Sequence, residues 1–267
     1  MSLTGLESCH PLLGEILQIA QEAGERILQV YGREDFGEQL KSDSSPLTEA
    51  DLAAHRHIVQ RLQALTPGWP ILSEESAAIP WSERQGWQRY WLVDPLDGTK
   101  EFIKRNGEFT VNIALIDQHR PILGVVHAPV LATSWLGDVE QGAFKQTGAG
   151  VEPIRVQPHQ PGEPWRVVGS RSHAGAGLAA FLADLGEHEL VSMGSSIKLC
   201  LVAEGAAHLY PRLGLTSEWD TAAAQAVVEA AGGEVIQQED AKALEYNRKE
   251  SLLNPFFIVR PIVHPGH

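Results

Sequence analysis

The sequence predicts a mixed fold with an α+β part followed by an α/β part, and three observations carry that prediction. Two amphipathic helices open the chain, because apolar residues recur at helical spacing over residues 11–31 and 48–65. Short strands follow between residues 69 and 137, and closely joined strands favour an antiparallel sheet. Strands and helices then alternate from residue 165 to residue 260, as in an α/β unit.

The two N-terminal helices have recognisable apolar faces. The face of the first consists of Leu12, Leu13, Ile16, Leu17, Ala20, Ala23, Ile27 and Leu28. Residues 33–46 are polar and end in Ser44-Ser45-Pro46, which indicates a loop. The second helix has its apolar stripe at Leu52, Ile58, Leu62 and Leu65, and Thr66-Pro67-Gly68 ends it.

The remaining elements follow from β-forming runs and helical spacing. The N-terminal strands are expected at 69–73, 89–94, 109–117, 122–127 and 133–137. Residues 146–164, rich in Gly, Pro and Gln, predict a boundary or crossover. Beyond it we expect strand 165–169, helix 176–186, a strand near 189–192, helix 195–205, strand 207–210, helix 220–231 and strands 233–236 and 256–260.

Composition and charge limit the function classes. The 267 residues suffice for one large domain or two packed ones, and the formal net charge of -13 opposes binding to nucleic acid or anionic membranes. An anionic substrate would need a locally positive site. Cys9 and Cys200 are spaced neither as zinc ligands nor as a disulfide framework, and Cys200 is expected in the core. The chain shows no signal-peptide pattern and no run of roughly 18 apolar residues, so we expect a cytoplasmic protein without a membrane span.

The run Trp91–Thr99 contains the main candidate for chemistry. Asp94 and Asp97 follow an apolar strand, Pro95 forces a break in regular pairing, and Gly98 permits an unusual backbone. Two carboxylates and the Leu96 carbonyl between them form a partial shell typical of Mg²⁺. A turn with solvated carboxylates explains the same pattern equally well.

Three further segments offer carboxylates. Glu74 follows the short strand 71–73, and it reaches Asp94 only if that strand lies beside the strand at 90–94. Asp220 precedes an alanine-rich helix, where Asp220 or Thr221 fits a helix cap as well as a metal site.

The fourth segment is Asp43–Asp51. Its Thr48 and Asp51 match a capping box, and Asp51 alternatively fits a base that orients water.

The negative charges of these segments favour a metal site if the segments meet in the fold. Glu74, Asp94, Asp97 and Asp220 would raise one another's pKa values and repel a phosphate. Two Mg²⁺ ions would cancel the four charges, activate a water and stabilise a leaving oxygen. Neither a P-loop motif nor a Gly-x-Ser-x-Gly motif occurs in the sequence.

These motifs resemble those of the inositol monophosphatase superfamily of Mg²⁺-dependent, lithium-sensitive phosphatases. Trp91–Thr99 is similar to its first signature and Trp219–Ala224 to its second. Glu74 precedes Asp94 at the separation of the family's metal-binding glutamate. The resemblance covers nearly the whole chain and implies a layered α/β/α/β/α sandwich. It also implies an N-terminal domain over 1–157 and a C-terminal α/β domain over 158–267, with the site between them.

Several details resemble the 3'(2'),5'-bisphosphate nucleotidase branch of that superfamily. They are the loop Asp43–Asp51, the run Thr99-Lys100-Glu101-Phe102, the segments Ser170–His173 and Gly194–Lys198, and the C-terminal stretch Tyr246–Asn254. The resemblance therefore implies removal of the 3'-phosphate of adenosine 3',5'-bisphosphate to give AMP, with the sulfated analogue as a further substrate. Such an activity belongs to sulfur assimilation or nucleotide recycling.

The resemblance also implies residue roles. Metal ligands, for two or three Mg²⁺ ions, would be Glu74, Asp94, the Leu96 carbonyl, Asp97 and Asp220. Asp51 and the Thr99 hydroxyl would orient and deprotonate the attacking water. Substrate contacts would come from Gly98 and Thr99, from the metal-binding Glu74, Leu96, Asp97 and Asp220, and from Ser170, His173, Gly194 and Lys198.

Alternatives remain on the same fold. They are inositol monophosphatase activity, fructose-1,6-bisphosphatase activity and a nucleotide sensor without turnover. The family further implies a monomer or homodimer, with peripheral association on the cytoplasmic face of the inner membrane as one option that the charge does not support.

Overall fold

A mixed sheet forms the centre of the molecule. The computed structural model describes residues 5–35, 37–40, 46–170 and 176–262. Within these ranges seven strands pair in the order β3-β4-β5-β6-β7-β8-β9. Their bounds are β3 Ile71–Ser73, β4 Arg89–Asp97, β5 Thr110–Asp117, β6 Arg120–Ala128, β7 Thr133–Asp138, β8 Gly142–Thr147 and β9 Gly150–Ile154. β3 is parallel to β4, and the other neighbours are antiparallel, which confirms the expected pairing of β5 with β6.

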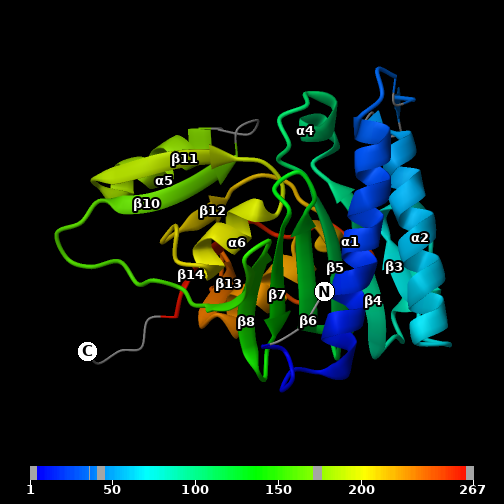
Figure 1. Ribbon diagram of the computed structural model, residues 1–267. Helices are drawn as coiled ribbons and strands as arrows, with labels where there is room; N and C mark the ends of the chain where they lie inside the picture. Colours follow the sequence, from blue (N-terminus) through cyan, green and yellow to red (C-terminus); the bar gives the residue numbers. More distant parts are fainter. Residues whose placement is uncertain (1–4, 36, 41–45, 171–175, 263–267) are drawn as a thin grey trace.

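Helices α1 (Pro11–Tyr31) and α2 (Glu49–Leu65) cover one face of this sheet, as Figure 1 shows. Both helices were predicted, and their apolar faces enter one core with the sheet residues Trp91, Val93 and Ile113. α1 has Pro11 at its first turn, where the missing N–H costs nothing. No helix in the described ranges is long and apolar enough to cross a bilayer.

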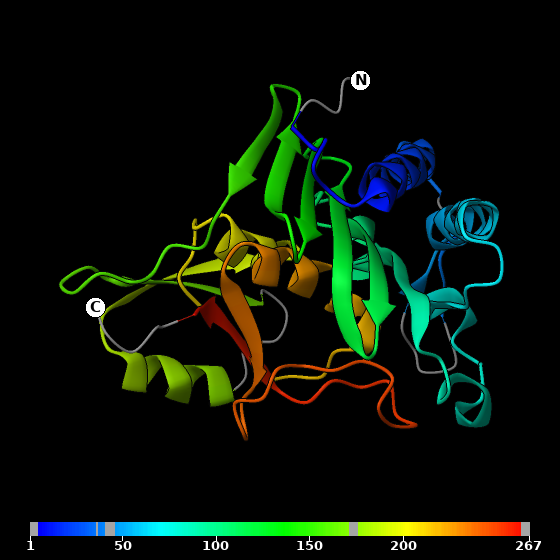
Figure 2. The ribbon, with the colours of Figure 1, turned by 90° about the horizontal axis from the view of Figure 1, so that it is seen from below.

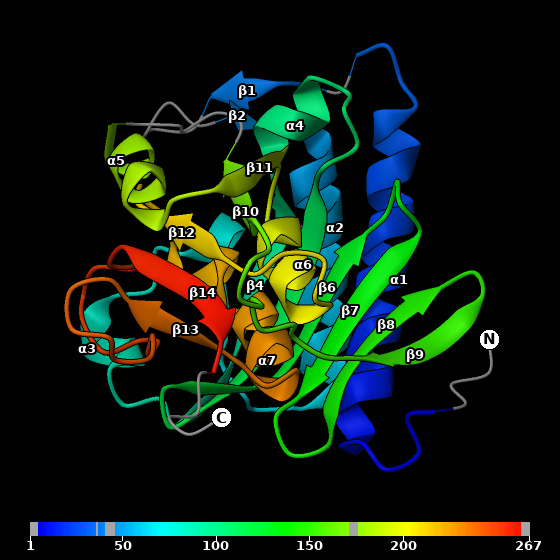
Figure 3. The same cartoon turned by 90° about the vertical axis from the view of Figure 1, so that its left-hand side faces the viewer.

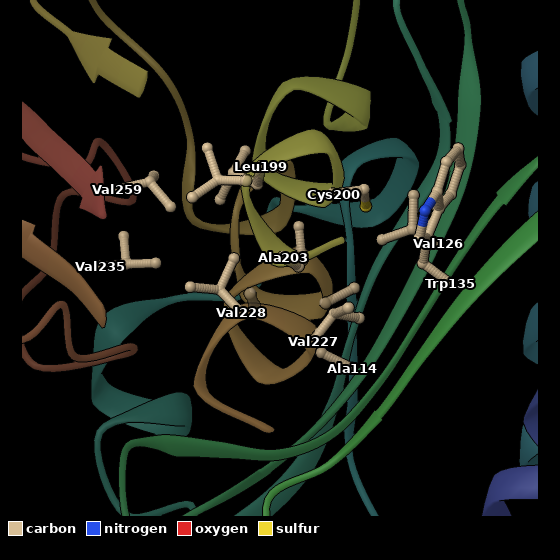
Figure 4. Close-up of a cluster of buried hydrophobic side chains, with 14 of the residues drawn as sticks. Ala114, Val126, Trp135, Leu199, Cys200, Ala203, Val227, Val228, Val235 and Val259 are labelled. Atoms are coloured by element: carbon tan, nitrogen blue, oxygen red, sulfur yellow. The ribbon is translucent and has the colours of Figure 1, made fainter. Parts of the chain in front are cut away.

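Helices α6 (Ile197–Ala203) and α7 (Ala222–Ala230) cover the opposite face. α7 packs close against the sheet because Gly124 and Gly137 have no side chain there. A Cβ at Gly124 would lie 2.1 Å from the Ala223 carbonyl oxygen. Figure 4 shows the core at this contact, in which the sheet and both helices meet β13 and β14. Cys200 is fully buried there, and both cysteines are free, as expected.

Two small sheets and a last helix complete the layers (Figures 2 and 3). β12 (Tyr210–Arg212), β14 (Phe257–Pro261) and β13 (Gly233–Gln237) form an antiparallel sheet in that order. β10 (Trp165–Ser170) pairs in parallel with β11 (His188–Met193), and α5 (Ala176–Leu185) lies beside them. The expected layered α/β/α/β/α class is therefore confirmed.

The structure differs from the predicted local structure in several places. The stretch 146–164 is not one boundary, because its first part belongs to the β8–β9 hairpin, whose glycines serve the turn. The domain division at residue 157, which stays a proposal, falls in the connection that follows β9.

Strands and helices alternate after residue 165, as predicted, and strands β12, β13 and β14 among them pair antiparallel. The predicted loop 33–46 contains strand β1 (Gln39–Leu40), which pairs with β2 (Pro46–Leu47). Short helices α3 (Trp81–Arg84) and α4 (Thr99–Ile103) were not predicted, since so few residues show no periodicity.

Candidate metal centre and substrate pocket

A β-bulge brings Asp94 and Asp97 to the same side of β4. Asp94 is paired with Asn112 and Asp97 with Thr110, so β4 contains one residue more than β5 in this interval. In a regular strand, side chains three positions apart would point to opposite faces. Pro95 lies within the bulge, in agreement with the predicted break in pairing. The aspartates are thus directed together by the irregularity that proline imposes.

Glu74 approaches the same point from the neighbouring strand. β3 and β4 are parallel, with Ser73 opposite Val93, so Glu74 leaves β3 at the level of Asp94. This confirms the condition on which the sequence made Glu74 a candidate. Burial raises the pKa of Asp94 well above its usual range, and the charge of Glu74 raises it further. The two carboxyl groups therefore interact directly.

Asp220 comes from the other end of the chain. It closes the short 3-10 turn Glu218–Asp220, and its Oδ2 accepts a hydrogen bond from the Ser217 backbone N–H at 2.8 Å. The prediction of a side-chain cap on the following helix is wrong, because Thr221 occupies that position without such a bond. The capping carboxylate serves the 3-10 turn instead, and this fixes the direction of Asp220.

The three aspartates form a group that fits a divalent cation. Asp94, Asp97 and Asp220 each offer a carboxylate oxygen, and these oxygens lie within 4.8 Å of one another. Burial raises the pKa of all three, that of Asp220 to about 8 with a further contribution from the charge of Asp97. Packing such groups without a cation costs free energy. Hard oxygen donors in this arrangement suit Mg²⁺.

Asp51 and Thr99 meet beside this group. Gly98 adopts a φ of 93°, which turns the chain into α4 and directs Thr99 back toward the helix α2. The Thr99 hydroxyl donates to Asp51 Oδ1 at 3.2 Å and lies 3.4 Å from the Leu96 carbonyl oxygen. Asp51 Oδ2 meanwhile accepts from the backbone N–H and the hydroxyl of Thr48. The capping box and the contact with Thr99 therefore exist together.

A polar network holds Asp97 from the side of α6. The Ser196 backbone N–H donates to Asp97 Oδ2 at 2.6 Å, and Asn112 Nδ2 lies 3.4 Å from the same oxygen. The Ser196 hydroxyl donates to Asn112 Oδ1 at 2.8 Å and contacts the hydroxyl of Thr110. Lys198 lies close by, and its positive charge lowers the pKa of Asp97 against the dominant effect of burial.

Lys198 itself is a buried cation. Its Nζ donates to the carbonyl oxygens of Met193 and Ser195 at 3.1 and 2.6 Å. Burial lowers the pKa of Lys198 to about 8, although the charge of Asp97 opposes this. Two of its three N–H groups are thus used within the fold, and one is available to a ligand.

A cavity of about 360 Å³ opens over these groups. Its walls include most of the predicted site residues: Glu74, Asp97, Gly98, Thr99, Ser170, Gly194, Lys198 and Asp220. Asp94 lies behind the wall at 1% exposure and Leu96 is equally buried. Asp51 is not part of the wall, but it accepts a hydrogen bond from Thr99, which is. Ser170 and Gly194 meet because parallel strands β10 and β11 end together. His173 lies outside the described residues.

The sequence indicated no site role for three further residues of the cavity wall. Arg212, on β12, is 9% exposed, donates through Nη2 to the Leu215 carbonyl oxygen and leaves Nε without a partner among the described residues. Tyr210 and Glu101 also line the cavity. A single arginine two residues after Tyr210 has no motif, and only the requirement for cations in an acidic protein could have drawn attention to it.

Comparison with known proteins identifies the family to which this chain belongs. The model of the inositol monophosphatase family matches residues 10–254. The chain belongs to this family. The curated relative "3'(2'),5'-bisphosphate nucleotidase CysQ" of Escherichia coli is 53% identical over 249 residues, which cover 93% of this chain and 99% of that protein. The protein of the same name from Aggregatibacter actinomycetemcomitans is 39% identical and covers 93% of this chain and 92% of its own.

Solved structures agree with this assignment. CysQ from Bacteroides thetaiotaomicron, described as a bacterial member of the inositol monophosphatase family, superposes with a TM-score of 0.82 at 44% identity. The match covers 92% of this chain and 95% of that one. The suhB protein from Bartonella henselae gives a TM-score of 0.79 at 26% identity, with 94% of each chain covered. The family is metal-dependent, which the carboxylate group suits.

Proposed function

We propose that this chain hydrolyses the 3'-phosphate of adenosine 3',5'-bisphosphate to AMP and phosphate in a Mg²⁺-dependent reaction. The observation that carries the proposal is the convergence of Asp94, Asp97 and Asp220 at a cavity that also presents two buried cations, Lys198 and Arg212. Close relatives named 3'(2'),5'-bisphosphate nucleotidase support the choice of substrate. We also propose that the sulfated analogue is a substrate and that the protein acts in the cytoplasm.

Two or three Mg²⁺ ions held by Glu74, Asp94, the Leu96 carbonyl, Asp97 and Asp220 would lower the pKa of a bound water and neutralise the phosphate. The remaining steps belong to the chain itself. Because the Thr99 hydroxyl donates its hydrogen to Asp51 Oδ1, its oxygen lone pairs accept a hydrogen from the attacking water. This orients the water toward phosphorus and gives its proton a route to Asp51.

The cations serve the part of the substrate that does not react. The third N–H of Lys198 and the guanidinium of Arg212 are donors in the wall of a cavity that carboxylates surround. A second phosphate satisfies such donors, and a monophosphate leaves one of them unpaired, which lowers its affinity. Ser170 and Gly194, with His173 from outside the described residues, would line the nucleotide on the far wall.

The test is phosphate release by the purified protein with Mg²⁺. The panel contains adenosine 3',5'-bisphosphate, its sulfated analogue, inositol 1-phosphate and fructose 1,6-bisphosphate, compared by kcat/KM. We expect the highest value for the nucleotide bisphosphate. A higher value for either sugar phosphate would transfer the proposal to that activity. Tight nucleotide binding without phosphate release would instead indicate a sensor.

A further inference from the structure

Glu101 is a buried acid in the cavity wall, and the proposed reaction gives it no role. It lies on α4, two residues beyond Thr99, is 6% exposed and lines the cavity. Its side chain runs against Gly194, where a Cβ would lie 2.7 Å from Glu101 Cγ. The glycine on one side and the helix on the other thus fix the direction of the carboxylate.

No hydrogen bond or ion pair to the Glu101 carboxylate exists in the part of the chain that the structure describes. Lys198 is close enough to feel its charge, but the Lys198 Nζ is bonded to backbone carbonyls and forms no ion pair with it. Glu101 is also not one of the three carboxylates that converge as a metal group. Glu101 lines the cavity, so a ligand that displaces water from its carboxylate must supply a hydrogen-bond donor in its place.

The chemistry of the substrate decides which donor this is. Phosphates are acceptors and repel a carboxylate, so only a sugar hydroxyl or the amino group of the base has hydrogens to offer. Glu101 is separated from Thr99 by a single residue, and Thr99 faces the reacting phosphate in the proposed reaction. The donor nearest that phosphate is the adjacent ribose hydroxyl.

We propose that Glu101 accepts a hydrogen bond from the ribose hydroxyl next to the scissile phosphate, and so selects ribonucleotides over deoxyribonucleotides. The inference rests on the proposed function, since it assigns a role within that substrate. Glu101 is then a specificity-determining residue rather than a catalytic one, because it touches neither the phosphate nor the water.

The experiment compares adenosine 3',5'-bisphosphate with its 2'-deoxy analogue in the wild type and in Glu101→Ala and Glu101→Gln. A hydrogen bond to a charged acceptor supports a ratio of kcat/KM of about tenfold or more in favour of the ribonucleotide. The ratio should fall to about one in Glu101→Ala and to an intermediate value in Glu101→Gln, whose amide oxygen still accepts. Since the ratio is taken within one variant, general effects on folding or metal binding cancel.

Glu108→Gln is the matched control. Glu108 also faces Lys198, yet it does not line the cavity and instead accepts from the Gly194 N–H at 2.8 Å. The control should keep the wild-type ratio. An unchanged ratio in Glu101→Ala, equal rates on both substrates in the wild type, or an equal loss of the ratio in Glu108→Gln would overturn the inference. Absence of phosphate release from the ribonucleotide by the wild type would overturn the proposed function itself.

Discussion

Asn254→Ala tests whether the C-terminal stretch Tyr246–Asn254 positions Asp220. The side-chain amide of Asn254 lies 2.7 Å from the Ser217 carbonyl oxygen, 3.0 Å from Thr221 Oγ1 and 3.2 Å from Thr216 Oγ1. Its two hydrogens satisfy two of these acceptors at a time. The amide thus binds the same peptide segment whose Ser217 N–H directs Asp220.

The magnitude follows from the bonds that are lost. Each hydrogen bond contributes about 1 kcal/mol net and the amide makes two at a time, so we expect a loss of about 2 kcal/mol in the free energy of unfolding. No further penalty is added, because the Thr221 hydroxyl keeps its bond from the Tyr246 hydroxyl and the Ser217 carbonyl keeps its bond from the Asp220 backbone N–H. Freed motion of Asp220 should also weaken Mg²⁺ binding by about tenfold.

Denaturant unfolding in the presence of a chelator measures the free energy of unfolding. Calorimetric titration with Mg²⁺ measures the metal affinity. Leu253→Ala is the control, because Leu253 is the neighbouring residue, is 43% exposed, and should leave both quantities near their wild-type values. Wild-type metal affinity in Asn254→Ala, whatever its stability, would refute a positioning role.

The remaining predictions concern the metal group, a buried histidine and a helix contact. Asp97→Asn should nearly abolish phosphate release and raise the stability of the metal-free protein, since it removes one charge from a close group of like charges; unchanged turnover would contradict the metal role. Burial lowers the pKa of His127 to about 4. As pH falls below about 6.5, this histidine therefore binds a proton in the unfolded chain but stays neutral in the folded chain. Stability should therefore drop by about 2 kcal/mol more between about pH 7 and about pH 5 in the wild type than in His127→Asn, measured by denaturant unfolding. Gly124→Ala should destabilise by at least about 2 kcal/mol, because its Cβ meets the Ala223 carbonyl, whereas Gly148→Ala, with open space around it, should unfold like the wild type.

The long periodic elements and the acidic motifs were predictable from the sequence. Helices α1 and α2 show apolar spacing over many turns, and the strand before Asp94 is an unbroken apolar run. The bulge at Pro95 was also foreseeable, because proline lacks the N–H that regular pairing requires. What these signals share is that they are local.

The residues that escaped prediction depend on contacts between distant segments. Arg212 is buried on β12, which pairs with β14, and no pattern in the surrounding sequence predicts that pairing. The network of Ser196 and Asn112 joins residues 84 apart in sequence. The hairpin β8–β9 was missed for a different reason: glycines of a tight turn and glycines of a linker look alike in sequence.

The competing structural and functional interpretations of the aspartates turn out to be compatible, and carboxylate geometry explains why. A carboxylate has two oxygens, and in each of these residues one oxygen accepts a backbone N–H from a nearby turn or segment. Thr48 supplies it to Asp51, Leu96 to Asp94, Ser196 to Asp97 and Ser217 to Asp220. The bond fixes the side-chain rotamer, and in Asp51 the second oxygen accepts from Thr99. Asp94, Asp97 and Asp220 each offer a carboxylate oxygen to the metal group. A capping motif that ends in a buried aspartate is therefore compatible with a functional site, since the cap is what holds the remaining oxygen in place.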